Sequence, residues 1–181
     1  MIAYTDAHHG AFPTGDSSTE IFQKLVDENH MVASGKSLIQ LLGNQDDYMQ
    51  IRDTALFYID MPGKTTATST TLKPENVCFD VTVPLDGTLP DDLPVVFTTG
   101  YRIDYSPGKA AAPITNSNLP NYAGVICAGG NAYGIWADKR WSDQIPWYFL
   151  PDHSIANFIS ADYKPNGRTY QQLTPDGPLG P

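Results

Sequence analysis

The chain has 181 residues, and its 20 acidic residues outnumber its 11 lysines and arginines to give a formal net charge of −9 at pH 7. Binding to nucleic-acid phosphates or anionic membrane surfaces needs clustered basic side chains, and the sequence has no basic run, so the composition argues against both partners. A hydrophobic content of 41% supports one globular domain over residues 1–181 with a substantial core. Fifteen glycines and fifteen prolines favour short elements and turns over a helical bundle.

The N-terminal region predicts a helix, a break and a second helix. The chain start has helical character, but Gly10 and Pro13 end any helix there, because Gly adopts the left-handed conformation and Pro lacks an N–H. A second helix is expected from about Thr19 to Asn29. Ser17 and Glu20 have the spacing of a capping box, and the apolar positions that follow share one face: Ile21, Phe22, Leu25 and Val26.

Further along the chain, the sequence predicts a short helix over Ser37–Leu42 and then a series of strands. Strands are expected where apolar and β-branched residues run between Gly and Pro breaks: 53–59, 75–83, 94–99, 101–105, 123–127 and 131–137. The Thr-rich segment 64–73 has no apolar face to bury and is interpreted as an exposed loop or edge hairpin. Residues 106–122 are expected to form a long loop, and Asp152 to cap a short helix through Ile159.

The order of these elements indicates the fold class. Helices come first and strands follow, which favours α+β with an antiparallel sheet, because parallel strands need helical crossovers. We therefore expect a helical part over 1–45, a sheet-rich part over 53–163 and a C-terminal tail over 164–181. The Pro-Gly end of that tail, from Thr174, is expected to fray.

Five residues near the start form a pattern of tyrosine, glycine, aromatic, proline and threonine: Tyr4, Gly10, Phe12, Pro13 and Thr14. This pattern resembles the end of the long N-terminal helix in type IV pilin-like proteins, especially the pseudopilins of type II secretion systems. In that family a second short helix follows, as it is expected to do here. A weaker similarity lies at Gly130–Asp138, which resembles the late hairpin of such proteins, with Asp138-Lys139-Arg140 in place of the usual Asp-Gly turn.

The resemblance implies a pilin-like fold, with N-terminal helices packed on an antiparallel sheet. It implies a non-enzymatic subunit of a surface filament or of the type II secretion apparatus, whose partners are other pilin-like subunits. The family's basic leader and long apolar helix are absent from this sequence. It has no run of the ~18 to 20 apolar residues that a membrane span needs. The implied location is therefore extracytoplasmic, at the periplasm or cell surface, with membrane anchoring through the absent segment. The competing interpretation is a cytosolic protein that starts at Met1.

The two cysteines, Cys78 and Cys127, leave two interpretations open. Both lie in apolar, strand-like runs. In an oxidising compartment they could form a disulfide worth roughly 3 to 4 kcal/mol in the chain-entropy model. Alternatively, they are unpaired buried cysteines that act as small hydrophobic side chains.

Candidate catalytic and metal-binding residues are few. Adjacent histidines point in different directions, so His8 and His9 are a poor site for one metal ion. The run Asp152-His153-Ser154 has the residue types of a hydrolytic triad, but a triad needs side chains that converge from separate positions. Calcium is the one cofactor that the resemblance allows, and no site is assigned among the candidate oxygen ligands: Asp138, Asp143, Asp152 and Asp176.

The aromatic residues in the last third of the chain provide an alternative function. They are Trp136, Trp141, Trp147, Tyr148 and Phe149. Packing against the predicted hairpin is one explanation. The other is a secreted adhesin or glycan-binding module, in which Trp141, Trp147 and Tyr148 form the interaction surface beside the loop 106–122.

Overall fold

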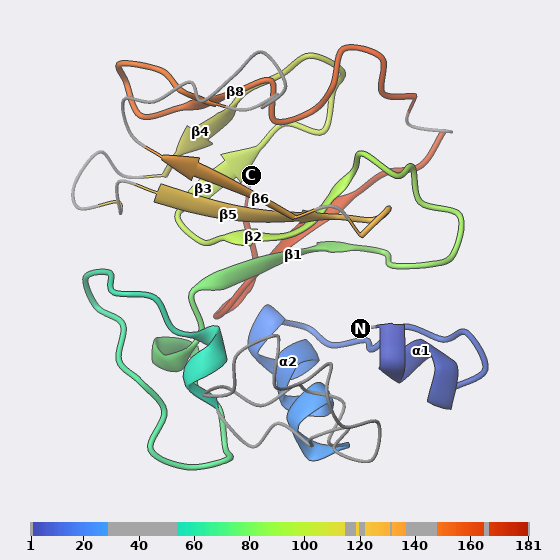
Figure 1. The fold of residues 1–181 in the computed structure, drawn as a ribbon, viewed down its shortest axis with the longest axis vertical. Coiled ribbons are helices and arrows are strands. Elements are labelled where there is room, and N and C mark those ends of the chain that lie inside the picture. The colour runs from blue at the N-terminus through green and yellow to red at the C-terminus, as the bar shows by residue number, and fades with distance from the viewer. Residues whose placement is uncertain are drawn as a thin grey trace, which may run out of the picture.

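The computed structural model describes residues 2–28, 54–114, 119, 122–130, 132–136, 148–164 and 167–180. Two antiparallel sheets carry most of the regular structure in these residues. The two described α-helices are short: α1 (Ile2–Ala7) and α2 (Ser18–Asp27). In Figure 1 the smaller sheet lies above the larger sheet, and the helices lie below the larger sheet. The predicted pilin-like α+β fold is therefore wrong, because a second sheet, and not a long helix, supplies the other half of the core.

The larger sheet has six strands in the spatial order β10-β9-β1-β2-β5-β6. Its strands are β1 (Phe79–Val83), β2 (Pro94–Thr98), β5 (Tyr122–Cys127), β6 (Ala132–Trp136), β9 (Gln171–Thr174) and β10 (Gly177–Pro178). The predicted β5–β6 hairpin is confirmed, with Val125 opposite Tyr133. The segment from Thr174 does not fray as predicted, because Gly177 and Pro178 of β10 pair with β9, and the Leu179 N–H donates to the Gln172 carbonyl at 3.0 Å.

The smaller sheet has four strands in the order β3-β4-β8-β7. They are β3 (Tyr101–Ile103), β4 (Ala111–Pro113), β7 (Tyr148–Phe149) and β8 (Ile155–Ala156). Gly100, at a φ of 99°, turns the chain out of β2 and into β3, a conformation that favours glycine. The helix predicted after Asp152 is wrong, because Ile155 instead pairs with Ala111 in this sheet.

The core consists of two apolar clusters on opposite faces of the six-stranded sheet. One lies between the two sheets and is built around Phe97, Tyr101 and Phe158. The other lies between the larger sheet and α2, where Val81 and Leu173 meet the buried face of the helix. Side chains alternate along a strand, so the neighbours of Val81 point toward the smaller sheet. This is the setting of the polar residues described below.

The N-terminal elements form as the sequence predicts. The backbone N–H of Gly10 donates to the carbonyl of Thr5 at 2.7 Å and closes α1, with Gly10 at a φ of 87°. Ser17 caps α2 by accepting a hydrogen bond from the N–H of Glu20 at 3.1 Å. The Glu20 carboxylate in turn accepts from the N–H of Asp16 at 2.8 Å. The C-terminal end of α1 and the N-terminal end of α2 are thus closed by local contacts.

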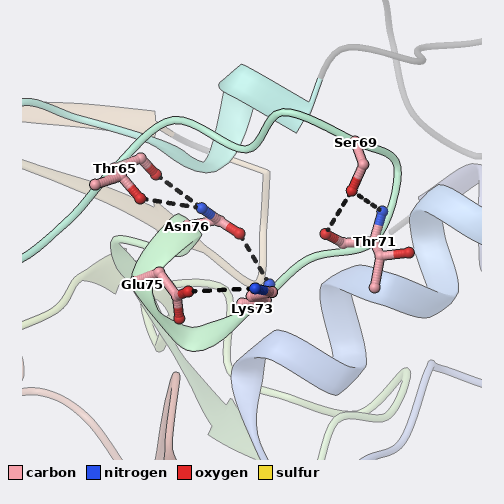
Figure 2. Close-up of polar contacts among 6 residues, drawn as sticks. All are labelled: Thr65, Ser69, Thr71, Lys73, Glu75 and Asn76. Carbon is pink, nitrogen blue, oxygen red and sulfur yellow. Dashed lines mark hydrogen bonds and ion pairs between the residues drawn. The ribbon is translucent and has the colours of Figure 1, made fainter.

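The segment that precedes β1 is held by side-chain hydrogen bonds. The described part of the predicted strand 53–59, residues 54–59, does not form a strand. Instead, η1 (Thr54–Phe57) is a 3-10 helix whose Phe57 stacks on Phe22 at 4.7 Å. Segment 64–73 is an exposed loop, one of the two predicted forms. It ends at η2 (Pro74–Asn76), where the Asn76 amide donates to Thr65 and accepts from the Lys73 N–H, as Figure 2 shows.

Replacement of Ser17 tests the cap of α2. Ser17→Ala removes the acceptor for the Glu20 N–H and should lower the free energy of unfolding by about 1 kcal/mol. Ser17→Asp keeps an acceptor near the helix N-terminus and should retain most of the stability. Chemical denaturation followed by circular dichroism measures both variants. Equal stabilities for Ser17→Ala and the original protein would show that the cap contributes nothing.

Candidate functional site

Polar side chains are buried between the two sheets, where apolar residues are expected. We define the polar seam as Asp80, Thr82, Tyr105 and Gln172. Asp80 and Thr82 project from β1, Gln172 projects from the neighbouring β9, and Tyr105 follows β3 in the other sheet. Asp80 and Thr82 have no exposed surface. Buried polar groups are costly unless they have partners, so each contact in the seam matters.

Gln172 joins the two sheets. Its Nε2 donates to Asp80 Oδ2 at 2.6 Å and to the carbonyl of Tyr101 at 2.5 Å. Its Oε1 accepts from the N–H of Ile103 at 3.1 Å. Tyr101 and Ile103 are two positions apart on β3, which is the edge strand of the smaller sheet. One side-chain amide therefore takes the place of a neighbouring strand along this edge.

Asp80 is the most unusual member of the polar seam. Its Oδ1 has no hydrogen-bond partner among the residues that the structure describes. Burial raises the pKa of Asp80 to about 7, an effect that Thr99, Gln172 and Lys64 partly offset. Desolvation dominates because a carboxylate loses its hydration in the seam without contacting a cation. The carboxyl group thus titrates near neutral pH.

Thr82 connects the seam to a cluster of tyrosines. Its hydroxyl donates to the carbonyl of Pro94 at 2.7 Å, so the Tyr105 hydroxyl donates to Thr82 Oγ1 at 2.8 Å. The ring of Tyr105 lies 5.7 Å from that of Tyr170, which lies 6.4 Å from that of Tyr163. Burial raises the pKa of Tyr105 and of Tyr163. These hydroxyls therefore stay protonated at neutral pH.

A surface hollow of about 580 Å³ lies beside this cluster. It is lined by Ile103, Asp104, Tyr105, Ser106, Pro107, Arg168, Thr169 and Tyr170. Asp104 accepts a hydrogen bond from the Ser106 N–H at 2.9 Å, and Arg168 pairs with Asp86. Hydrogen bonds from Thr88, with the Arg168 charge, lower the pKa of Asp86. The hollow thus offers hydroxyl and charged groups, and no histidine is among its described lining residues.

The run Asp152-His153-Ser154 forms a hairpin turn and not a triad. Asp152 Oδ1 accepts hydrogen bonds from the Ser154 N–H, at 3.0 Å, and from the Ser154 hydroxyl. These bonds lower the pKa of Asp152. His153 is exposed, and its backbone has a φ of 63°. The aspartate contacts the serine directly, without the histidine between them that a triad requires.

The other sequence-derived metal and ligand candidates do not converge. His8 stacks on Tyr4 at 4.0 Å and pairs with Glu28, whereas His9 is exposed. Within the described ranges, no group of three His, Cys, Asp or Glu residues could hold a metal ion. Asp138, Asp143, Trp141 and Trp147 lie outside the described residues, as does the predicted helix 37–42. Tyr148 lies half-buried in β7, opposite Ala156.

The two cysteines are free and buried. Cys127 lies opposite Pro94, at the start of β2. The Cys78 carbonyl accepts from the N–H of Thr99, just beyond the other end of β2. Five residues of strand separate these points by roughly 16 Å, well beyond the reach of a disulfide. The structure therefore favours unpaired cysteines, and burial raises the pKa of both thiols.

The residues of the N-terminal pattern lie at the junction between α1 and α2. Tyr4 and Pro13 are buried, and Phe12 is half-buried. The carbonyl of Thr14 accepts from the Lys24 ammonium at 2.5 Å, which ties the linker to α2. Gly10 closes α1. Gly10 and the Thr14 carbonyl therefore help to fix the path from one helix to the next.

The sequence analysis did not identify the polar seam. One signal was present, because Asp80 interrupts the apolar run 77–83 with a charge where a buried strand is expected. No comparable signal marks Gln172, because it follows a loop and its amide is polar like its neighbours. Its role depends on the contact between β9 and β3, which is 69 positions away in sequence.

Comparison of the chain with protein-family models, with curated proteins and with solved structures gave no match in any of the three. Functional argument therefore depends on the geometry of the chain itself. Among the helices of the described residues, none has both the length and the apolar character that crossing a bilayer requires.

The left-handed backbone at His153 provides a direct test of the turn assignment. His153→Gly should raise the free energy of unfolding by about 1 kcal/mol, because glycine adopts this conformation without steric cost. His153→Ala removes the ring but keeps the strain, and should not stabilise the protein. Thermal unfolding of both variants measures the difference. A gain in His153→Ala equal to that in His153→Gly would show that the ring, and not the backbone, is unfavourable.

Proposed function

We propose that this chain is a non-enzymatic subunit of a surface filament or of a type II secretion apparatus, joined to its assembly through an N-terminal helix. The observation that carries the proposal is the way α1 is fixed to the rest of the molecule. Tyr4 is 8% exposed and belongs to the same apolar cluster as Ile21 and Phe22 of α2. Its ring also stacks on His8, which pairs with Glu28 beyond the end of α2.

This docking supports a mechanical role for α1. A helix of six residues is not stable alone in water, so its conformation depends on contacts with the rest of the molecule, which we call the head. The Tyr4 ring provides an apolar contact, and the His8–Glu28 pair fixes the end of the helix. A helix that transmits force between an assembly and its head needs such a rigid connection. The five residues of the pilin-like sequence pattern all lie in this connection.

The head consists of two packed sheets, so the expected pilin-like arrangement of helix and sheet gives no support. The proposal depends on the junction at residues 2–17 and on the sequence pattern there. The two-sheet head would then serve as the part of the subunit that meets its surroundings.

Deletion of the gene and its complementation test this function. Cells that lack the gene should lose a surface filament seen by electron microscopy, or the export of at least one protein seen by comparing culture supernatants. The full-length original gene should restore the phenotype. Tyr4→Ala, which removes the docked ring, should restore it poorly although the head still folds. Lys164→Ala, at an exposed position far along the chain, is the control and should restore it fully.

Two outcomes would refute the assembly function. One is normal filaments and normal export in the deletion strain. The other is an upstream genomic sequence without a basic leader and apolar helix in frame. A Tyr4→Ala protein that restores the phenotype fully would refute the role of the docked α1 alone.

A glycan-binding module is the second candidate, and the hollow beside the tyrosine cluster favours it. Two residues of the hollow, Ser106 and Pro107, belong to the loop that the sequence analysis connected with binding. Tyr105, Asp104 and Arg168 add an aromatic ring and charged groups that sugar hydroxyls can contact. Such a site resembles carbohydrate recognition in its mixture of aromatic and polar groups.

Binding to a glycan array tests the second candidate. The purified protein should bind a defined set of glycans, and Arg168→Ala should weaken that binding at least about tenfold, the effect of losing one charged hydrogen bond. Lys109→Ala, which removes an exposed charge outside the lining, should leave binding unchanged. A protein that binds no glycan at millimolar concentration would rule this function out.

A further inference from the structure

We infer that Asp80 and Gln172 form a proton-dependent latch between the two sheets, closed when Asp80 carries a proton and weakened when Asp80 is ionised. The latch goes beyond the proposed assembly function and does not depend on it. It is built from residues on β1, β9 and β3, all of which are described in the structure.

The hydrogen bonds show why the proton matters. Both hydrogens of Gln172 Nε2 are used, one by Asp80 Oδ2 and one by the Tyr101 carbonyl. Asp80 Oδ1 has no partner in the part of the chain that the structure describes. A proton on Oδ1 would remove the buried charge and leave the bond from Gln172 to Oδ2 in place. An ionised Asp80 instead keeps a desolvated negative charge between the sheets.

The groups around Asp80 compensate for this charge only in part. Thr99 faces it from beyond the end of β2, Gln172 from β9, and Tyr101 and Tyr105 from β3 and the residues after it. Asp176, in the turn between β9 and β10, repels it. Lys64 is the cation that attracts it, but the Lys64 ammonium donates to the Pro74 carbonyl at 2.8 Å. The carboxyl group is therefore easier to protonate than an exposed one.

The sign of the pH effect follows from these contacts. The pKa of Asp80 is about 7 in the folded protein, above the ordinary aspartate value of 3.8. Below pH 4 both the folded and unfolded states carry the proton, and the full stability is present. As the pH rises from about 4 to about 7, the unfolded state releases the proton first, so stability falls. The loss continues through pH 7 and levels off about one pH unit above it, where the folded protein is ionised too.

The test compares Asp80→Asn with the original protein from pH 4 to pH 8. Asparagine is neutral and close in shape to the protonated acid, so it should remove the pH dependence that Asp80 causes. The folding equilibrium constant of the original protein, divided by that of Asp80→Asn, should fall at least about tenfold across this range. Asp162→Asn removes one exposed carboxylate and is the matched control; its ratio should not show this fall.

A local measurement separates the latch from a general effect of charge. The Ile103 N–H donates to Gln172 Oε1, so its hydrogen-exchange protection reports whether the latch is closed. After correction for the intrinsic exchange rate, this protection should fall from pH 5 to pH 8 in the original protein and stay constant in Asp80→Asn. The amide of Val125, in β5 of the larger sheet, is the reference and should change less.

Two results would contradict the proposed latch. It is wrong if the Ile103 amide keeps the same protection over the whole range in the original protein. If Asp80→Asn does not fold, the side-chain carboxyl carbon of Asp80 can be titrated by NMR in the original protein. A titration midpoint above pH 6 supports the latch, and a midpoint near 4 overturns it.

Discussion

The contact on which this fold most depends is the pairing of the Gln172 amide with the edge of β3. The strands of the smaller sheet are only two or three residues long, so each provides few ladder hydrogen bonds. The edge of such a strand would leave a buried carbonyl and N–H unpaired, at a cost of about 1 to 3 kcal/mol for each group. Gln172 satisfies both groups, and it does so from the larger sheet. The two layers are therefore connected by directional bonds as well as by apolar packing.

The same device occurs a second time, outside the sheets. The amide of Gln23 on α2 donates to the Thr70 carbonyl at 3.0 Å and accepts from the Leu72 N–H at 2.6 Å. These partners are again two positions apart, here in the loop that precedes η2. Short elements and long connections leave many backbone groups without a ladder partner, and glutamine amides supply the missing bonds. A chain rich in Gly and Pro can thus remain ordered without long helices or strands.

The sequence predicted the local elements better than their arrangement. The cap at Ser17, the α2 helix and the β5–β6 hairpin depend on signals within a few residues, and all three are confirmed. The apolar runs predicted β2 and β3. They did not predict that the chain turns at Gly100 and that the two strands belong to different sheets. Ile155 was assigned to a helix, because its pairing with Ala111 depends on a distant segment. The polar seam was missed for the same reason, since Asp80 and Gln172 meet only in the folded chain.

The junction at residues 2–17 and the two-sheet head are separate parts of the molecule. The pattern of tyrosine, glycine, aromatic, proline and threonine lies in residues 4–14, and it concerns the path between two helices and not the fold of the sheets behind them. The wrong prediction of the fold is therefore compatible with the confirmed prediction of a helix, a break and a second helix in this segment. Tyr4 belongs to the apolar cluster around α2, on the face of the larger sheet opposite the smaller sheet, so its docking does not depend on the packing between the two sheets.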